Sequence, residues 1–313
     1  MKSLVTGGAG FIGHHLVEEL ASASPSDVVV IDKYSRVQAG ARAEFSEGVR
    51  VYRADILDST VLRQAMKGVE TVFHLAALSS VGVAQDDPAL AFQSNVMGTA
   101  RVLEAARSCG VRRVVITSSR EVYGEPDNLP VPESAPLRPK NVYGLTKASA
   151  ETCCELASGL EVAILRLANV YGPGDFGRVI PIFIHNALLG LPIPIYGGDQ
   201  ILDFVWIRHV VAMLINAARG EVNIGGAVNV GSGVGVTLSS LAARIRDLTG
   251  SSSPLQYLPA KPFEVTRFVA DTRSAAHLLG QRESGSLAQI GQAVEWYEAQ
   301  LRRDAAETRW RSS

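Results

Sequence analysis

The N-terminal segment holds the pattern that most restricts what this chain can fold into. The apolar stretch Lys2–Thr6 leads into Gly7-Gly8-Ala9-Gly10-Phe11-Ile12-Gly13, and a helical pattern of apolar residues follows. Such glycines allow a tight turn, close approach of the backbone to a pyrophosphate, and close packing of a helix on a strand. The free N–H groups and the dipole of the helix N-terminus favour an anion there. We therefore predict a strand–turn–helix unit whose loop binds a dinucleotide through Gly7, Gly10, Phe11, Ile12 and Gly13; taken by itself, such a loop could also be an ordinary strand-to-helix turn.

An acidic residue follows at the position that a dinucleotide requires. The apolar strand Val28–Ile31 ends in Asp32, about 20 residues past the glycines, where a carboxylate accepts hydrogen bonds from a ribose 2′-hydroxyl. The same carboxylate repels a 2′-phosphate, so the sequence favours NAD over NADP. The cations Lys33 and Arg36, which follow soon after, weaken this preference because a cation there can accommodate a 2′-phosphate.

Three residues in the middle of the chain suggest what the cofactor does. Tyr143 and Lys147 lie four residues apart, so they share one face of a helix. An ammonium near a phenol stabilises the phenolate and lowers the pKa of the tyrosine from about 10 toward the working range. A serine hydroxyl, from Ser119, would orient a substrate hydroxyl. Together the three groups suit removal of a proton from an alcohol while a nicotinamide accepts a hydride.

The remaining pattern predicts an α/β protein. Strand-like runs at Val28–Ile31, Val51–Arg53, Thr71–Leu75, Arg113–Thr117 and Val162–Leu167 alternate with helical stretches that include Pro88–Cys109 and Val142–Ser158. This alternation predicts a doubly wound parallel sheet with helices on both faces. Beyond Asn169 the chain becomes rich in proline and glycine. We expect a cofactor domain over residues 1–168, a smaller, mainly substrate-binding domain over residues 169–313, and a return of residues 203–232 to the first domain.

These motifs, taken in order, resemble the extended short-chain dehydrogenase/reductases, and more narrowly their nucleotide-sugar epimerase/dehydratase branch. The resemblance runs from Lys2 to about Glu298. It implies a Rossmann-type fold with bound NAD. The matching segments include Asp55-Ile56, His74-Leu75-Ala76-Ala77, Asn95-Val96-Met97-Gly98-Thr99 and Asn169-Val170-Tyr171-Gly172-Pro173. Beside the glycine loop and Asp32, the implied cofactor contacts are Asp55, Ile56, Leu75, Ala76, Ala77, Asn95, Tyr143 and Lys147. For Asp55, contact with adenine and a plain turn role are both open.

The resemblance also implies a reaction. Relatives oxidise the C4 hydroxyl of a nucleotide-linked sugar to a ketone. The keto sugar then takes the hydride back on its other face to give the C4 epimer, loses water, or loses a C6 carboxylate as carbon dioxide. We expect a 4-epimerase acting on a UDP-hexose or UDP-uronate, with Tyr143 as base, Lys147 as its partner and Ser119 as donor. Glu121 lies where dehydratases and decarboxylases of the family carry a catalytic glutamate, so those reactions form the alternative; Glu121 could equally bond the loop backbone. A regulator that senses NAD without turnover is a further, less favoured possibility.

Arg120 departs from the dehydratase pattern, in which an aspartic acid protonates the leaving C6 hydroxyl. An arginine cannot donate that proton usefully. Two interpretations remain: its planar fork binds a C6 carboxylate, or it pairs with Glu125, Asp127 or Glu133 on the same loop. We favour the second.

The nucleotide end departs from the family as well. Relatives usually carry an arginine where this chain has Leu202, and a second arginine where it has Lys261. Arg178 is the best substitute cation for the diphosphate, although simple solvation of its side chain is equally open. The expected substrate contacts are Ser79, Ser119, Arg120, Tyr143, Asn169, Arg178 and Lys261.

Composition argues against other classes of protein. The chain mixes 30 basic with 31 acidic residues, which does not suit a nucleic-acid surface. We see no signal pattern and no run that could cross a bilayer. Cys109, Cys153 and Cys154 have no metal-binding spacing and are expected to be free thiols in a reducing cytoplasm. We therefore expect no nucleic acid, membrane or metal partner. The resemblance implies a homodimer formed by Pro88–Cys109 and Val142–Ser158. The apolar residues Leu90, Val102, Leu103 and Leu156 fit a buried face there, either at the dimer interface or in the core of the single chain.

Overall fold

The computed structural model describes residues 1–35, 44–220, 226–280 and 285–311, with side chains as far as Arg303. Arg36 lies outside the described residues. Within them, no helix is both long and apolar enough to cross a membrane.

Seven parallel strands form the central sheet, in the order β10-β6-β5-β4-β1-β2-β3. The strands are β1 (Ser3–Thr6), β2 (Val28–Asp32), β3 (Arg50–Arg53), β4 (Thr71–His74), β5 (Arg113–Ser119), β6 (Glu161–Leu167) and β10 (Ala227–Val230). The order reverses direction between β1 and β4, and open α/β sheets bind ligands at the carboxyl ends of the strands beside such a point. The expected Rossmann-type fold is confirmed.

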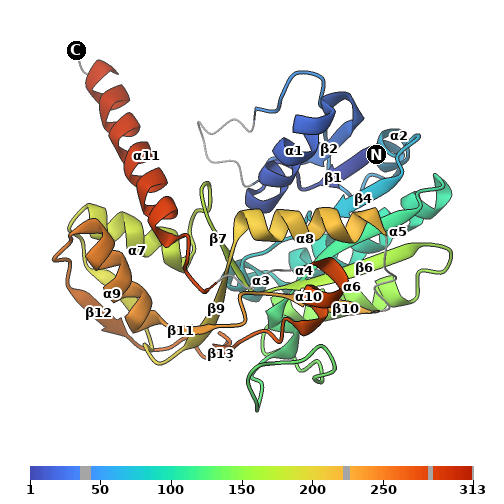
Figure 1. The fold of residues 1–313 in the computed structure, drawn as a ribbon. Helices are drawn as coiled ribbons and strands as arrows, with labels where there is room; N and C mark the ends of the chain where they lie inside the picture. The colour runs from blue at the N-terminus through green and yellow to red at the C-terminus, as the bar shows by residue number, and fades with distance from the viewer. Residues whose placement is uncertain (36–43, 221–225, 281–284, 312–313) are drawn as a thin grey trace.

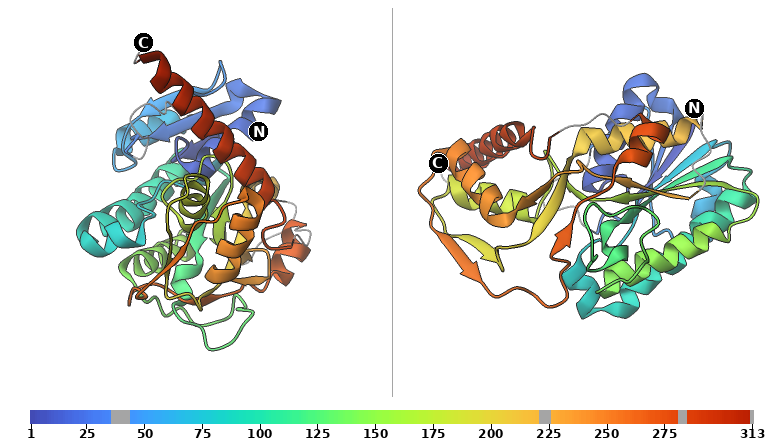
Figure 2. Two further views of the ribbon diagram at one scale, coloured as in Figure 1. Left: turned by 90° about the vertical axis from the view of Figure 1, so that its left-hand side faces the viewer. Right: turned by 60° about the horizontal axis from the view of Figure 1, so that its bottom comes forward.

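Helices cover both faces of this sheet (Figure 1 and Figure 2, right). They are α1 (Phe11–Ala23), α2 (Ser59–Ala65), α3 (Val81–Asp86), α4 (Pro88–Phe92), α5 (Gly98–Ser108), α6 (Val142–Glu155), α8 (Ile207–Arg219) and α10 (Arg273–Leu279), with short turns η1 (Pro25–Asp27), η2 (Gln93–Met97) and η3 (Arg120–Tyr123). Successive side chains of a strand point to opposite faces. Val5 therefore packs with Leu16 of α1 in one core, and Leu4 packs with Val102 of α5 in the other.

The second region is built on small sheets. Strand β9 (Ile201–Trp206) pairs with β7 (Asn169–Tyr171), β11 (Gly235–Thr237) and β13 (Arg267–Phe268), while β8 (Ile193–Tyr196) pairs with β12 (Leu255–Leu258). Helices α7 (Val179–Leu188), α9 (Leu238–Thr249) and α11 (Ile290–Arg311) pack together around them (Figure 2).

The expected return of residues 203–232 to the main sheet needs a correction. Helix α8 packs on α1, β5 and β6, and β10 joins the edge of the main sheet, but β9 stays in the small sheet. Asp203 explains why β9 still lies close by. Its buried carboxylate accepts hydrogen bonds from the backbone N–H groups of Ser232, Gly233 and Ala270 at 2.7, 3.0 and 3.1 Å. Side-chain bonds rather than strand pairing therefore fasten β9 to the loop after β10.

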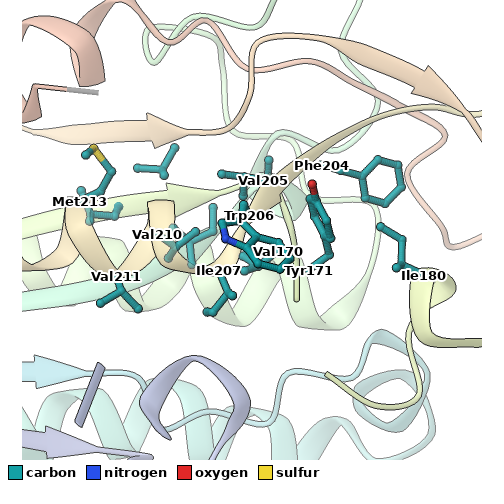
Figure 3. Packing of buried hydrophobic residues seen from close by; sticks show 14 of the residues in the cluster. Val170, Tyr171, Ile180, Phe204, Val205, Trp206, Ile207, Val210, Val211 and Met213 are labelled. Atoms are coloured by element: carbon teal, nitrogen blue, oxygen red, sulfur yellow. The ribbon is translucent and has the colours of Figure 1, made fainter. Parts of the chain in front are cut away.

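An apolar cluster joins the two regions (Figure 3). Tyr171 of β7 and Trp206 of β9 meet edge to face, with ring centroids 5.2 Å apart, and Val210 of α8 packs in the same cluster. A Cβ at Gly172 would lie 2.3 Å from Ile207, so only glycine permits this contact. The junction is a dry core, which holds the small sheets in place beside the main sheet.

A buried ion pair anchors α6 to the main sheet. The Arg166 guanidinium of β6 contacts both carboxylate oxygens of Glu151 at 2.7–3.1 Å, and it donates to the Tyr123 hydroxyl at 2.8 Å. Glu151 also accepts a hydrogen bond from Ser118 of β5. Tyr123 donates in turn to Asn229 of β10 at 2.7 Å. Since both charged side chains are less than 10% exposed, the pair has little help from solvent.

Replacing one partner of this pair is expected to destabilise the protein strongly. Arg166→Met leaves the buried Glu151 carboxylate without its hydrogen-bonded cation, and we expect it to lower the free energy of unfolding by about 3–5 kcal/mol, measured by urea denaturation. Arg101→Met, which removes an exposed ion pair with Glu104, is the control and should cost less than about 1 kcal/mol. Equal losses in the two variants would contradict the anchoring role.

Candidate active site

The glycine loop between β1 and α1 has the shape of a pyrophosphate cradle. Gly7 has a φ of 72°, and a Cβ there would lie 2.7 Å from the backbone nitrogen of Ala76. A Cβ at Gly13 would lie 2.1 Å from the Gly7 carbonyl oxygen. Both positions therefore require glycine, and the N-terminus of α1 lies directly against the loop. The chain's own backbone fits a dinucleotide at this place.

Acidic side chains follow the next two strands. Asp32, at the end of β2, accepts hydrogen bonds from the backbone N–H groups of Ala9 at 3.0 Å and Tyr34 at 2.6 Å. Its carboxylate thus lies beside the glycine loop, as a ribose-binding residue must. Asp55, after β3, accepts from the Leu57 N–H at 3.1 Å and pairs with Lys33 at 3.2 Å. The turn role that we considered for Asp55 is visible, and Ile56 beside it is buried in the core.

The loop after β4 is held by two buried polar residues. His74 lies between the hydroxyls of Thr6 at 2.7 Å and Thr99 at 2.9 Å. Burial, helped by the nearby Lys147 ammonium, lowers the pKa of His74 to about 3. The Asn95 amide exchanges two hydrogen bonds with the backbone of Leu78, at 2.8 and 3.1 Å. These contacts fix the segment that contains Leu75, Ala76, Ala77 and Ser79.

Asn95 also shows why the helix expected over Pro88–Cys109 is not regular. It lies in η2, a π-helical turn that separates α4 from α5, and π turns occur often at functional sites. From there its Nδ2 donates to the Thr146 hydroxyl of α6 at 2.9 Å. The amide of Asn95, a predicted cofactor contact, therefore joins the loop after β4 to α6 through hydrogen bonds.

Ser119, Tyr143 and Lys147 come from two neighbouring elements. Ser119 ends β5, and its hydroxyl accepts the Glu121 N–H at 3.2 Å. Tyr143 lies in the first turn of α6, which touches η3: a Cβ at Gly144 would lie 2.4 Å from the Glu121 carbonyl oxygen. Lys147 follows one turn later and is 4% exposed. Burial lowers the pKa of its ammonium to about 8, against the opposing effect of Cys154 and Glu151.

Glu121 and Arg120 bind each other, which neither interpretation of Arg120 had included. Arg120 Nη2 lies 2.9 Å from Glu121 Oε1, so its partner is the adjacent residue rather than Glu125, Asp127 or Glu133. Asn141 Nδ2 donates to the other oxygen, Glu121 Oε2, at 2.7 Å. The Glu121 side chain is thus engaged at both oxygens.

Asn141 is a residue of this site that the motif analysis missed. Its Oδ1 accepts the Gly144 N–H at 2.8 Å and caps α6, while its Nδ2 donates to Glu121 and to the Phe263 carbonyl at 3.0 Å. An asparagine directly before a helical pattern is a known N-cap signal, so its place was readable. Its second bond, to a loop more than a hundred residues away, was not.

Arg178 and Lys261, two expected substrate cations, each have partners within the chain. Arg178 precedes α7, pairs with Asp175 at 3.6 Å and lies over the Phe11 ring of the glycine loop at 5.7 Å. Lys261 pairs with Glu264 at 3.4 Å and lies over the Tyr196 ring of β8 at 4.7 Å. Asn169 donates to the Asp203 carbonyl at 3.0 Å, and Leu202 is buried. Arg178 is therefore the cation of this set that contacts the glycine loop.

The buried His74 is expected to make stability fall in acid. Because its folded pKa of about 3 lies below the unfolded value near 6.5, the unfolded chain binds more protons between these values. Stability should therefore decrease as pH falls from 6 to 4, by up to about 1.4 kcal/mol per pH unit from this residue. His74→Gln should remove that part of the slope in urea titrations, while the exposed His277→Gln should not. Parallel slopes for wild type and His74→Gln would contradict this origin.

Comparison with known proteins agrees with this geometry. Residues 3–231 match the NAD dependent epimerase/dehydratase family. A UDP-glucose 4-epimerase of Mycolicibacterium smegmatis is 36% identical over 312 residues, which cover 95% of this chain and 98% of the relative. UDP-glucuronic acid decarboxylase 3 of Arabidopsis thaliana is 31% identical, with 90% and 84% covered. The crystal structure of a Bacillus cereus UDP-glucuronic acid 4-epimerase, in complex with UDP-glucuronic acid and NAD, superposes with a TM-score of 0.90 at 28% identity, over 96% of this chain and 99% of that one. With the family match spanning the glycine loop, the Ser-Tyr-Lys set and β10, the chain belongs to the NAD-dependent epimerase/dehydratase family.

Proposed function

We propose that this chain is an NAD-dependent nucleotide-sugar 4-epimerase acting on a UDP-linked sugar. The observation that carries this choice within the family is the state of Glu121. Its two oxygens are engaged by Arg120 and Asn141, and its side chain is 7% exposed. With both oxygens engaged by the protein, Glu121 is poorly placed to remove a proton from C5, the step that elimination of water requires. Return of the hydride to C4 is then favoured over elimination, while decarboxylation needs no base at C5 and stays the alternative.

The roles of the chain's own residues follow from their places. Tyr143 takes the proton of the C4 hydroxyl and gives it back, since it lies at the start of α6 beside η3. The Lys147 ammonium, one turn further along α6, favours the phenolate. Ser119 donates to the substrate oxygen and keeps it in line with Tyr143. Asn141 caps α6 and so fixes the turn that carries Tyr143.

The glycine loop and Asp32 would hold NAD, the pyrophosphate at the N-terminus of α1 and the ribose at the carboxylate. When bound, NAD would supply the hydride acceptor for C4 and the hydride donor for the opposite face of the ketone. Arg178, beside the glycine loop, is the proposed contact for the substrate diphosphate, and Lys261 and Asn169 are secondary candidates.

Decarboxylation is the alternative that a relative supports, because a UDP-glucuronic acid decarboxylase covers most of this chain. It shares the oxidation at C4 and differs in the fate of the ketone. The mass of the product decides between the two: an epimer keeps the mass of its substrate, a decarboxylated sugar loses carbon dioxide, and an eliminated sugar loses water.

Tyr143→Phe tests turnover directly. Removing the phenolic oxygen should lower kcat by at least about a thousandfold, while NAD content and melting temperature stay close to those of the wild type. The products from UDP-glucose, UDP-N-acetylglucosamine and UDP-glucuronate would be followed by proton NMR and mass spectrometry. Unchanged turnover in Tyr143→Phe would refute the assignment, and bound NAD with no turnover in the wild type would favour the sensor.

We also propose a homodimer. Val102 and Leu103, two of the expected interface residues, are buried in the core of the single chain and cannot contribute. Leu90 and Met97, on packed helical segments next to α6, are 37% and 50% exposed. These side chains suit a contact between two copies of the α4–α6 surface.

The dimer has a direct test. Light scattering should give about twice the 33.3 kDa of one chain for the wild type. The double variant Leu90→Glu, Met97→Glu should have the mass of one chain, because a dimer would bury its new charges at the interface. Leu248→Glu, at an exposed position of α9, serves as control. A monomeric wild type would end the proposal.

We also propose a reducing, cytoplasmic location, because Cys109, Cys153 and Cys154 are free thiols among the residues that the structure describes.

A further inference from the structure

Arg120 carries a donor that the fold does not use. Its side chain is 11% exposed, and Nη2 is taken by Glu121. Nη1 is buried, and no acceptor for it exists among the residues that the structure describes. A buried guanidinium nitrogen without an acceptor costs free energy and calls for an explanation. No such cost arises if a substrate group accepts these hydrogen bonds.

The position of Arg120 limits which group that can be. It follows Ser119 directly, so their Cα atoms lie about 3.8 Å apart. Its turn, η3, touches the first turn of α6 beside Tyr143. If Ser119 and Tyr143 hold the C4 oxygen, the ring substituents beside it are the C3 hydroxyl and C6 with its oxygens, and of these only C6 can be a carboxylate.

The unused donors of Arg120 indicate the form of C6. Glu121 neutralises the single positive charge of Arg120, but it uses only Nη2 and leaves both N–H groups of Nη1, which can only donate. The planar donors of a guanidinium match the geometry of a carboxylate, which is the acceptor that arginine favours at buried sites. The Glu121 carboxylate does not need Nη1 as a partner, since Asn141 and Arg120 Nη2 already engage both of its oxygens.

We propose that Arg120 recognises a carboxylate at C6, and that the preferred substrate is therefore a UDP-linked uronic acid. This inference rests on the proposed function for the placing of C4. In this arrangement the two terminal nitrogens of Arg120 have different roles: Nη2 keeps Glu121 in place and Nη1 binds the substrate carboxylate. Arg120 is thus the specificity-determining residue of the site.

Binding measurements test this separately from turnover. The NAD-saturated protein would be titrated by calorimetry with UDP-glucuronate, UDP-glucose and UDP, at about 0.15 M salt to screen exposed charges. The wild type should bind UDP-glucuronate at least about tenfold more tightly than UDP-glucose, the ratio that corresponds to 1.4 kcal/mol. Arg120→Met should remove this preference and leave the affinity for UDP unchanged. Arg120→Lys, which keeps the charge but loses the planar fork, should retain only part of the preference.

Arg138→Met is the matched control, because Arg138 is an exposed arginine on the same connection between β5 and α6. It should keep the wild-type ratio. Arg120→Met leaves Glu121 without its ion pair. If that variant does not fold, the ratio of the two sugar-nucleotide affinities in the wild type and in Arg120→Lys still tests the proposal. Equal affinities for the two sugar nucleotides in the wild type would overturn the proposal, as would failure to bind UDP-glucuronate or an equal loss of UDP affinity in the variants.

Product analysis on the same samples separates this proposal from the proposed function. Epimerised UDP-glucose without any preference for UDP-glucuronate would overturn the carboxylate site alone. A tenfold preference for UDP-glucuronate together with loss of carbon dioxide would keep the carboxylate site and overturn the epimerase.

Discussion

The buried contact between Glu151 and Arg166 is the interaction on which the geometry of this site depends. Glu151 lies on α6, one turn beyond Lys147, and Arg166 lies on β6, so their ion pair fixes how far along the sheet α6 is placed. Ser118, the neighbour of Ser119, donates to the same carboxylate. One anion therefore positions the strand end that carries the serine and the helix that carries the tyrosine and lysine. Such a pair is costly to desolvate, and its value lies in geometry more than in net stability.

A second set of polar bonds does the same work across the two regions of the molecule. Asn141 caps α6, binds Glu121 and reaches the Phe263 carbonyl of the second region. Nearby, Lys140 donates to Glu125 and to the Glu264 carbonyl, at 3.2 and 2.9 Å. The connection between β5 and α6 is thus tied to the loop that contains Lys261. A substrate that binds between the glycine loop and this connection would contact both regions at once.

The fold and the use of NAD were predictable from the sequence, because their signals are local. The glycines, Asp32 and the residues after β4 each lie at a strand end, and all parallel strands of one sheet place those ends on the same edge. The side-chain partners in the turn after β5 were not predictable in this way. The partner of Arg120 turned out to be its neighbour Glu121, and the pair could not be foreseen because its direction depends on how η3 turns against α6. No local pattern shows that the π turn directs the Asn95 amide to Leu78 and Thr146, and its contact with the cofactor stays a prediction.

The amino-acid sequence by itself determined the order of strands and helices, the dinucleotide loop and the residue types of the reacting set, since these follow from periodicity and from spacing within single elements. Only the tertiary structure decided which side chains are already occupied. Glu121 is held at both oxygens, Arg120 retains one unused donor, and β9 is fastened through Asp203 instead of by pairing with the main sheet. The physical reason is that a hydrogen bond or ion pair between residues far apart in the chain depends on distances of a few tenths of an ångström, which the packing of whole elements sets and no local pattern encodes.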